Sequence, residues 1–196
     1  MFTGDLNRTV VIPFSYFEPE SIPNNSCLFL EDATLHHFGV LSSAVHMAWV
    51  KVVCGRLESR YRYSNKLVYN NFPWPNPTPE QRERVEEKAQ AVLDARTPHL
   101  SPRGMSTLAD LYDPLSMPPE LVKAHTELDR AVEKCYRPEA FRSDRERVEH
   151  LFRLYEKLTA PLLPTTPQKR GRRSQTAATI PKPRKQRTPG LPGQTS

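Results

Sequence analysis

The sequence predicts an α+β protein in three parts, and three observations lead to this assignment. Residues 1–77 combine β-branched stretches with an apolar region of helical character. Residues 78–160 repeat apolar side chains at three- and four-residue spacing, which is typical of amphipathic helices. Residues 161–196 hold seven prolines and eight Lys or Arg but no acid, too little apolar material for a core. We therefore expect a mixed part, a small all-α part and a disordered basic tail.

Two short strands and two helices are predicted in the first part. Residues 8–16 (RTVVIPFSY) are rich in β-branched side chains, and Leu28–Leu30 is a second short apolar run. Asp32 is a candidate N-cap for a helix that begins at Ala33. A second helix is expected over Ser43–Val53, with these apolar side chains inward: Val45, Met47, Ala48, Trp49 and Val52.

Prolines separate this part from the next. The run Asn71–Pro77 places proline at every second position, so it cannot be helical and predicts an extended linker. Helices are then expected to begin at Thr78 (boxed by Gln81, with Pro79 first in the helix), at Pro118–Pro119, and at Ser143 (boxed by Glu146). Their predicted inward faces comprise Val85, Ala89, Val92 and Leu93; Leu121, Ala124, Leu128, Ala131, Val132 and Cys135; and Val148, Leu151, Phe152, Tyr155 and Leu158.

The positive charge of the chain is concentrated in the tail. The whole chain carries a net charge of +6, whereas the tail alone carries +8, so residues 1–160 have a balance of −2. Any nucleic-acid-binding face on the folded part must therefore be a local patch rather than a general positive field.

Cysteine and histidine usage argues against disulfides and metal sites. Cys27, Cys54 and Cys135 are odd in number and contain no CxxC pair, which indicates reduced thiols in a cytoplasmic protein. The six histidines form no cluster with metal-ligand spacing, and His46 and His125 fit packed or hydrogen-bonded core positions. We see no signal peptide, and no apolar run approaches the ~20 residues of a membrane span, so no membrane partner is expected.

A basic and aromatic run follows the apolar region. Between Arg56 and Tyr69, Glu58 is the only acid. Cations neutralise phosphates while tyrosines stack or hydrogen-bond, so this mixture suits nucleic acid. The competing interpretation is an ordinary solvated basic loop. The cations and tyrosines of the run are Arg56, Arg60, Arg62 and Lys66, with Tyr61, Tyr63 and Tyr69.

Four motifs in this region, in this order and spacing, resemble the target-recognition domain of the MmeI family: HFGVLSS, HMAWV, GRLESRYRYS and YNNFPWP. The stretch LADLYDPLSMPPELVKAHTELDRAV and residues 145–158 resemble that family's C-terminal helical domain. These bacterial type IIL restriction-modification enzymes also carry an adenine-specific DNA methyltransferase. The resemblance implies a partial α/β target-recognition domain over 1–77, a helical domain over 78–160, and double-stranded DNA as partner.

The same resemblance assigns roles to the residues of the run. Positions matching Glu58 and Arg60 form a covarying base-reading pair in the family, with lysine and aspartate as the alternative. Glu can accept from cytosine N4 and Arg can donate to guanine O6 and N7. In an extended segment residues two apart face the same side, so both could reach one C·G pair. An exposed ion pair is the competing interpretation. The expected phosphate contacts or loop supports are Arg56, Tyr61, Arg62, Tyr63, Ser64 and Lys66.

No catalytic residue is expected within this chain. Its glycines before the tail stand singly, so there is no glycine-rich loop to hold S-adenosylmethionine, the cofactor of the full-length family. We predict DNA sequence recognition for catalytic domains located elsewhere, with a separately encoded methyltransferase fragment as one candidate partner. Two other interpretations stay open: a truncated gene remnant without independent function, and a helical module that binds protein.

Overall fold

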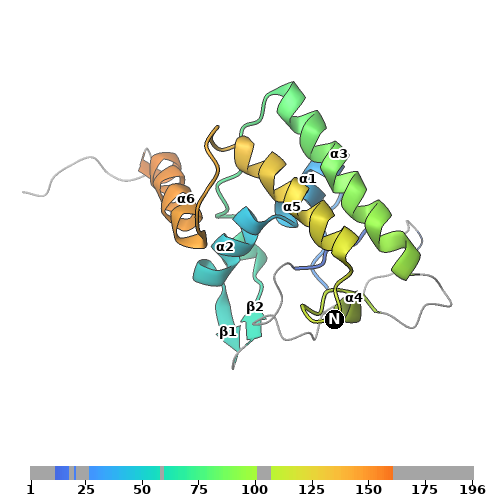
Figure 1. Ribbon diagram of the computed structural model, residues 1–196. Helices are drawn as coiled ribbons and strands as arrows, with labels where there is room; N and C mark the ends of the chain where they lie inside the picture. The colour runs from blue at the N-terminus through green and yellow to red at the C-terminus, as the bar shows by residue number, and fades with distance from the viewer. Residues whose placement is uncertain (1–11, 18–19, 21–26, 58–59, 101–106, 161–196) are drawn as a thin grey trace, which may run out of the picture. The chain divides into compact units, whose positions relative to one another are not determined.

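The structure, a computed structural model, describes residues 12–17, 20, 27–57, 60–100 and 107–160, apart from the side chains of residues 56, 57 and 60. Within these ranges most of the regular structure is helical (Figure 1). The α-helices are α1 (Leu35–Leu41), α2 (Ala44–Val53), α3 (Pro79–Arg96), α4 (Leu108–Leu111), α5 (Pro119–Lys134) and α6 (Asp144–Thr159). A π-helix, η1 (Asn65–Tyr69), and a 3-10 turn, η2 (Thr97–His99), complete the helical elements.

The strand content of the described residues is small. Strands β1 (Gly55–Leu57) and β2 (Arg60–Arg62) form one two-stranded antiparallel sheet, in which Arg56 lies opposite Tyr61. The predicted mixed α+β fold is therefore not confirmed, because all other regular structure among the described residues is helical.

Both strands predicted near the N-terminus are wrong wherever the structure describes them. Residues 12–16 and Leu28–Leu30 belong to no strand, and residues 8–11 lie outside the described ranges. A strand is stable only when a neighbour accepts and donates its backbone hydrogen bonds. Neither segment has such a neighbour among the described residues; instead, the Phe14 carbonyl accepts a hydrogen bond from the Arg96 side chain at 2.6 Å.

Most helix starts follow the predicted capping residues. Thr78 and Gln81 form the expected box at the start of α3, with Pro79 first in the helix. Two details differ. The N-cap of α1 is Thr34 rather than Asp32. Asp32 has a φ of 53° and therefore lies in the left-handed region, in a turn before the helix. At α6, Ser143 is the N-cap as predicted, but the Glu146 carboxylate accepts from the Arg142 backbone N–H instead of closing a box on Ser143.

Three side chains predicted to point inward are exposed. Val52 on α2 is 55% exposed, and on α6 Phe152 and Leu158 are 37% and 63% exposed. Helix α2 is buried on all sides over Val45–Val50, and Val52 lies beyond this stretch, in the last turn. Helix α6 has Leu151 as its one fully buried side chain, and Phe152 and Leu158 lie away from that position. By contrast, Trp49 on α2 and Leu151 on α6 are almost fully buried where the two helices pack together.

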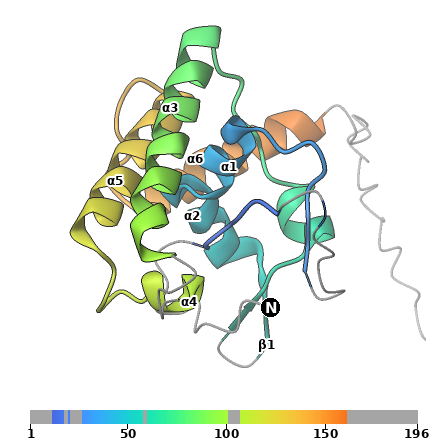
Figure 2. The same cartoon turned by 90° about the vertical axis from the view of Figure 1, so that its right-hand side faces the viewer.

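One hydrophobic core joins the first predicted part to the second. Helix α1 packs against α3 and α5, and α2 packs against α6. Figure 2 shows α3 and α5 side by side, as in Figure 1, with α1 next to them. Gly39 on α1 marks the closest approach, because a Cβ built there would lie 2.8 Å from Val85 Cγ1 and 3.3 Å from Ala89 Cβ. Residues 1–163 accordingly group as one compact unit.

Two sets of side-chain hydrogen bonds also link the helices: one joins Arg96, Tyr112 and His125, and the other joins Asp129 to the start of α2. Arg96 at the end of α3 is 2% exposed, and its Nε donates to the Tyr112 hydroxyl at 2.6 Å. That hydroxyl in turn lies 2.8 Å from Nε2 of His125 on α5, where burial lowers the pKa of the histidine to about 4. Asp129 on α5 accepts a hydrogen bond from the Ala44 backbone N–H, at the start of α2, at 2.7 Å.

We expect Gly39→Ala to lower the free energy of unfolding by about 1–3 kcal/mol, because the new methyl group overlaps buried atoms of α3. Gly55→Ala is the matched control, since a Cβ at Gly55 meets nothing within 4 Å. Urea unfolding of both variants tests this, and equal midpoints would show that α1 can shift without cost.

The Asp129 contact predicts a pH dependence. Burial raises the pKa of this carboxyl to about 6, so the native state favours its protonated form. This contribution to the free energy of unfolding is largest below about pH 4 and is lost as the pH rises through about 6. Asp129→Asn keeps an oxygen facing the Ala44 N–H but cannot titrate. Urea unfolding at about pH 4 and pH 7 should show the native protein losing stability relative to this variant, by on the order of 3 kcal/mol. If the stability difference between the native protein and the variant is the same at both pH values, the predicted titration of Asp129 is wrong.

Candidate nucleic-acid interface

The basic and aromatic run forms the small sheet and the π-helix that follows it. Leu57 pairs with Arg60 across the sheet, so Gly55–Leu57 and Arg60–Arg62 are two antiparallel strands and not parts of one extended segment. Glu58 lies outside the described residues, as do the side chains of Arg56 and Arg60. That Glu58 and Arg60 face the same base pair therefore stays a prediction.

A buried hydrogen-bonded pair anchors the end of β2. His46 on α2 is fully buried; its Nδ1 donates to the Leu41 carbonyl at 2.8 Å, which leaves Nε2 to accept from the Tyr63 hydroxyl at 3.1 Å. Burial lowers the pKa of His46 to about 4, so the ring is neutral near pH 7. Burial likewise raises the pKa of Tyr63, which keeps its hydroxyl a donor. The sheet is thus held to α2 by an uncharged link.

The π-helix η1 is fixed from both ends. Ser64 caps it by accepting from the Leu67 backbone N–H at 3.4 Å, and Asn71 donates to the Lys66 and Leu67 carbonyls at 2.9 and 3.1 Å. From the core side, Trp49 Nε1 donates to the Val68 carbonyl at 3.1 Å. The backbone that carries Lys66 is therefore rigidly placed.

The structure separates the described members of the run into exposed cations and packed supports. Arg62 and Lys66 are exposed. Tyr61 and Tyr63 are partly buried and pack against the core. Ser64 is committed to its cap. The exposed cations are accessible to phosphate groups, and the packed tyrosines fix the backbone that carries these cations.

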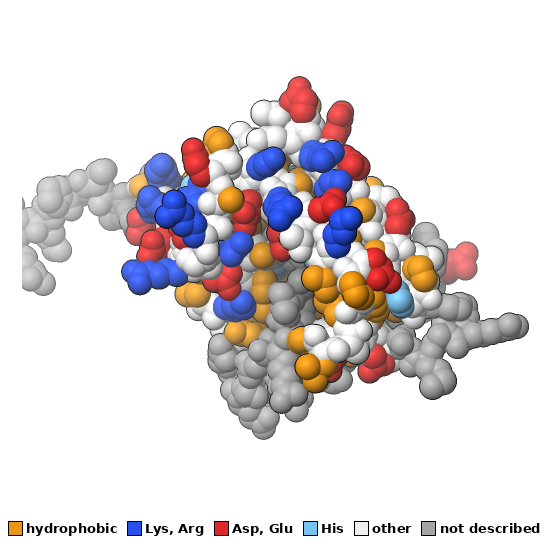
Figure 3. Space-filling view, viewed as in Figure 1, with side chains coloured by type: hydrophobic (Ala, Val, Ile, Leu, Met, Phe, Trp, Pro, Cys, Tyr) orange, Lys and Arg blue, Asp and Glu red, His pale blue; other side chains and the backbone are white. Residues whose placement is uncertain are grey.

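Elsewhere on the described surface, cations are interleaved with acids. Figure 3 shows Lys and Arg spread over the face formed by α3, α5 and α6, with Asp and Glu between them. Lys88 on α3 pairs with Glu127 on α5 at 3.0 Å, and Arg147 on α6 pairs with Glu133 on α5. This face therefore carries no broad positive field.

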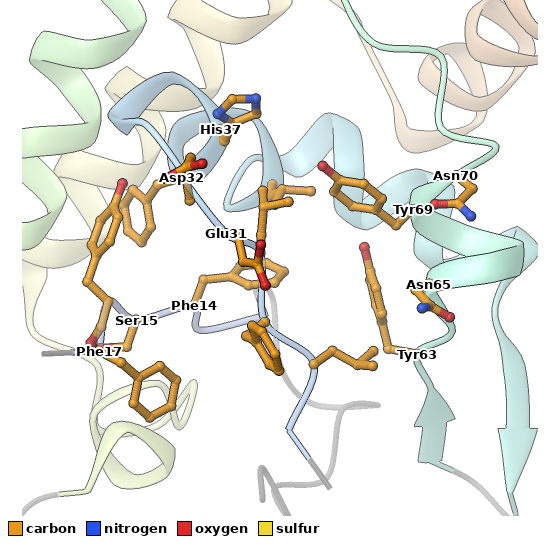
Figure 4. Close-up of a pocket in the computed structure, with 17 residues that line it drawn as sticks. Phe14, Ser15, Phe17, Glu31, Asp32, His37, Tyr63, Asn65, Tyr69 and Asn70 are labelled. Atoms are coloured by element: carbon orange, nitrogen blue, oxygen red, sulfur yellow. The ribbon is translucent and has the colours of Figure 1, made fainter. Parts of the chain in front are cut away.

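An apolar cleft opens beside the sheet, and sequence reasoning missed it. Figure 4 shows Tyr63 and Tyr69 on one side, Phe14 and Phe17 on the other, and Glu31 between them. Its volume is about 770 Å³. The only sequence signal was indirect: segments 8–16 and 28–30 are apolar and β-prone, and described residues from both line this cleft.

The part of the chain that the structure describes lacks both a metal-ligand cluster and a membrane-spanning helix. No group of three or more His, Cys, Asp or Glu side chains is arranged to hold a metal ion there. None of its helices is both long and apolar enough to cross a membrane.

Comparison with known proteins covers almost all of this unit. The MmeI target recognition domain matches residues 7–76, and the MmeI C-terminal domain matches residues 77–163. DNA methyltransferase A of Bacillus subtilis (strain 168) is 42% identical over 148 residues, which are 76% of this chain but 16% of that protein.

A solved structure is similar as well. The type IIL restriction-modification enzyme MmeI, solved in complex with DNA, shares 46% sequence identity with a TM-score of 0.61. The match covers 66% of this chain and 17% of that enzyme. The chain thus spans about a sixth of the length of both relatives.

The His46–Tyr63 link yields a stability prediction. Tyr63→Phe leaves the buried Nε2 of His46 without a donor, which should lower the free energy of unfolding by about 1–3 kcal/mol. Tyr69→Phe is the control, because the Tyr69 hydroxyl makes no hydrogen bond to any described residue. Thermal unfolding compares the two variants, and indistinguishable midpoints would argue against the link.

Proposed function

Since this chain belongs to the MmeI family of restriction-modification enzymes, we propose that it is the part of such an enzyme that reads the DNA sequence. The observation that carries this proposal is the match of residues 7–76 to the MmeI target recognition domain, and the 46% identity to MmeI, a protein solved in complex with DNA, supports it. Adenine methylation would be performed by polypeptide that this chain does not contain, either in a longer protein or in a separately encoded fragment.

We assign phosphate contacts and base contacts to different residues of the interface. Exposed Arg62 and Lys66 are placed by the Tyr63 link and by the π-helix, and are suited to phosphate oxygens, which fix register without reading sequence. Glu58 and Arg60 are assigned to base edges, the carboxylate on cytosine N4 and the guanidinium on guanine O6 and N7. Double-stranded DNA is the proposed partner.

The residues of this chain do not fit S-adenosylmethionine. Binding that cofactor calls for a glycine-rich loop, whereas the glycines before residue 161 stand singly at Gly4, Gly39, Gly55 and Gly104. We therefore assign no methyl-transfer step to this chain. Its contribution to the reaction is the choice of the site that is methylated.

The test reassembles an enzyme from two polypeptides. One is the full 196-residue chain, and the other is the Bacillus subtilis DNA methyltransferase A without the region that matches this chain, called here the truncated relative. The double substitution Glu58→Lys with Arg60→Asp reverses donor and acceptor, so the C·G pair that they read should become G·C. Sequencing of methylated sites measures the motif. Each lost base contact should cost about 1–3 kcal/mol of discrimination.

The chain offers a matched control for this charge reversal. Arg145 and Glu149 form an exposed ion pair on α6 at 2.8 Å, with side chains 88% and 54% exposed. Glu149→Lys with Arg145→Asp makes the same chemical change there and should leave the methylated motif unaltered. If the Glu58 and Arg60 variant also keeps its motif, the two residues are a surface ion pair and not a base-reading pair.

A further inference from the structure

The apolar cleft beside the sheet gathers exposed hydrophobic side chains in one place. Its lining includes five large hydrophobic side chains that are exposed: Tyr16 (43%), Phe17 (55%), Leu28 (57%), Phe29 (66%) and Leu30 (39%). They come from two segments and converge on one hollow (Figure 4). A contiguous apolar patch of this kind, rather than scattered residues, marks an interaction surface.

The backbone of the second of these segments, Leu28–Leu30, has no hydrogen-bond partner among the described residues. The composition of this segment nevertheless favours a strand, and unpaired N–H and C=O groups beside exposed apolar side chains are what an added strand satisfies. The segment therefore fits a strand whose neighbour is supplied from elsewhere.

The charges in the cleft indicate protein rather than DNA as the occupant. Glu31 and Asp32 line it, and no Lys or Arg is among its described lining residues. Phosphates would be repelled there. Arg62, which can meet phosphate, lines a separate depression that shares Leu28, Tyr63 and Asn65 with the cleft. The two depressions are thus adjacent: the cleft carries carboxylates and no described cation, and the other depression carries Arg62.

We propose that Leu28–Leu30 pairs with a β-strand of the methyltransferase-bearing polypeptide, whose apolar side chains fill the cleft. The inference rests on the proposed function, because that polypeptide makes up the roughly five-sixths of both relatives that this chain does not match. The incoming strand carries apolar residues toward Phe17 and Phe29 and a cation toward Glu31. Recognition of DNA and attachment to the catalytic part thereby use adjacent but separate surfaces.

Binding of the full chain to the truncated relative, without DNA, tests this proposal. Leu28→Asp should weaken binding about tenfold or more, since an apolar side chain is replaced by a charge inside the contact. Leu115→Asp makes the same change at a side chain that is 91% exposed and outside the cleft, and should leave the dissociation constant unchanged. In hydrogen exchange, the amides of Phe29 and Leu30 should become protected in the complex.

Several results would contradict the pairing of Leu28–Leu30 with the methyltransferase-bearing polypeptide, and each can be distinguished from the others. No binding, equal binding of the two variants, or complex formation without amide protection would overturn the proposal. Destabilisation of the isolated chain by Leu28→Asp would show that the chain fills its own cleft, and a Leu28-dependent dimer would assign the cleft to a second copy. Both results would also refute it. Because these assays contain no DNA, a failure of sequence reading at Glu58 and Arg60 does not affect them.

Discussion

At Gly39 the backbone of α1 comes so close to α3 and α5 that side chains of both occupy the space where a Cβ would stand. This approach lets the apolar face of α1, which begins at Leu35, share one core with helices that begin at Pro79 and Pro119. Residues on both sides of the predicted boundary at residue 77 therefore contribute to one core. Because the sheet is attached to α2, which follows α1 directly, its position depends on the same core.

Two hydrogen bonds from α2 fix the position of the sheet and of the π-helix on this core. His46 and Trp49 lie one turn apart on α2 and hold two successive elements, the end of β2 and the π-helix. Both links are uncharged and buried, so they are little affected by salt or by pH near neutrality. The surface that we propose for DNA binding is thereby supported by buried contacts that DNA would not compete for.

The apolar cleft is lined by a β-prone segment that has no strand partner among the described residues. The segment Leu28–Leu30 has the composition of a strand, yet its side chains are exposed and its backbone makes no hydrogen bond to any described residue. Strand formation is a non-local event, because one segment cannot satisfy its own hydrogen bonds. A chain that matches about a sixth of its relatives can carry the strand-forming sequence without its neighbour.

What the sequence alone determined is what local chemistry encodes. The capping residues of α3 and α6, the prolines at residues 73–77, the buried faces of α3 and α5, and the family itself could all be inferred from neighbours along the chain. Glu58 and Arg60 remain a prediction from that family. Tertiary structure alone decided which β-prone segments pair, that Thr34 rather than Asp32 caps α1, that His46 meets Tyr63, and that an apolar cleft stays open. Each of these depends on groups far apart in sequence or on small differences in backbone conformation, neither of which local composition specifies.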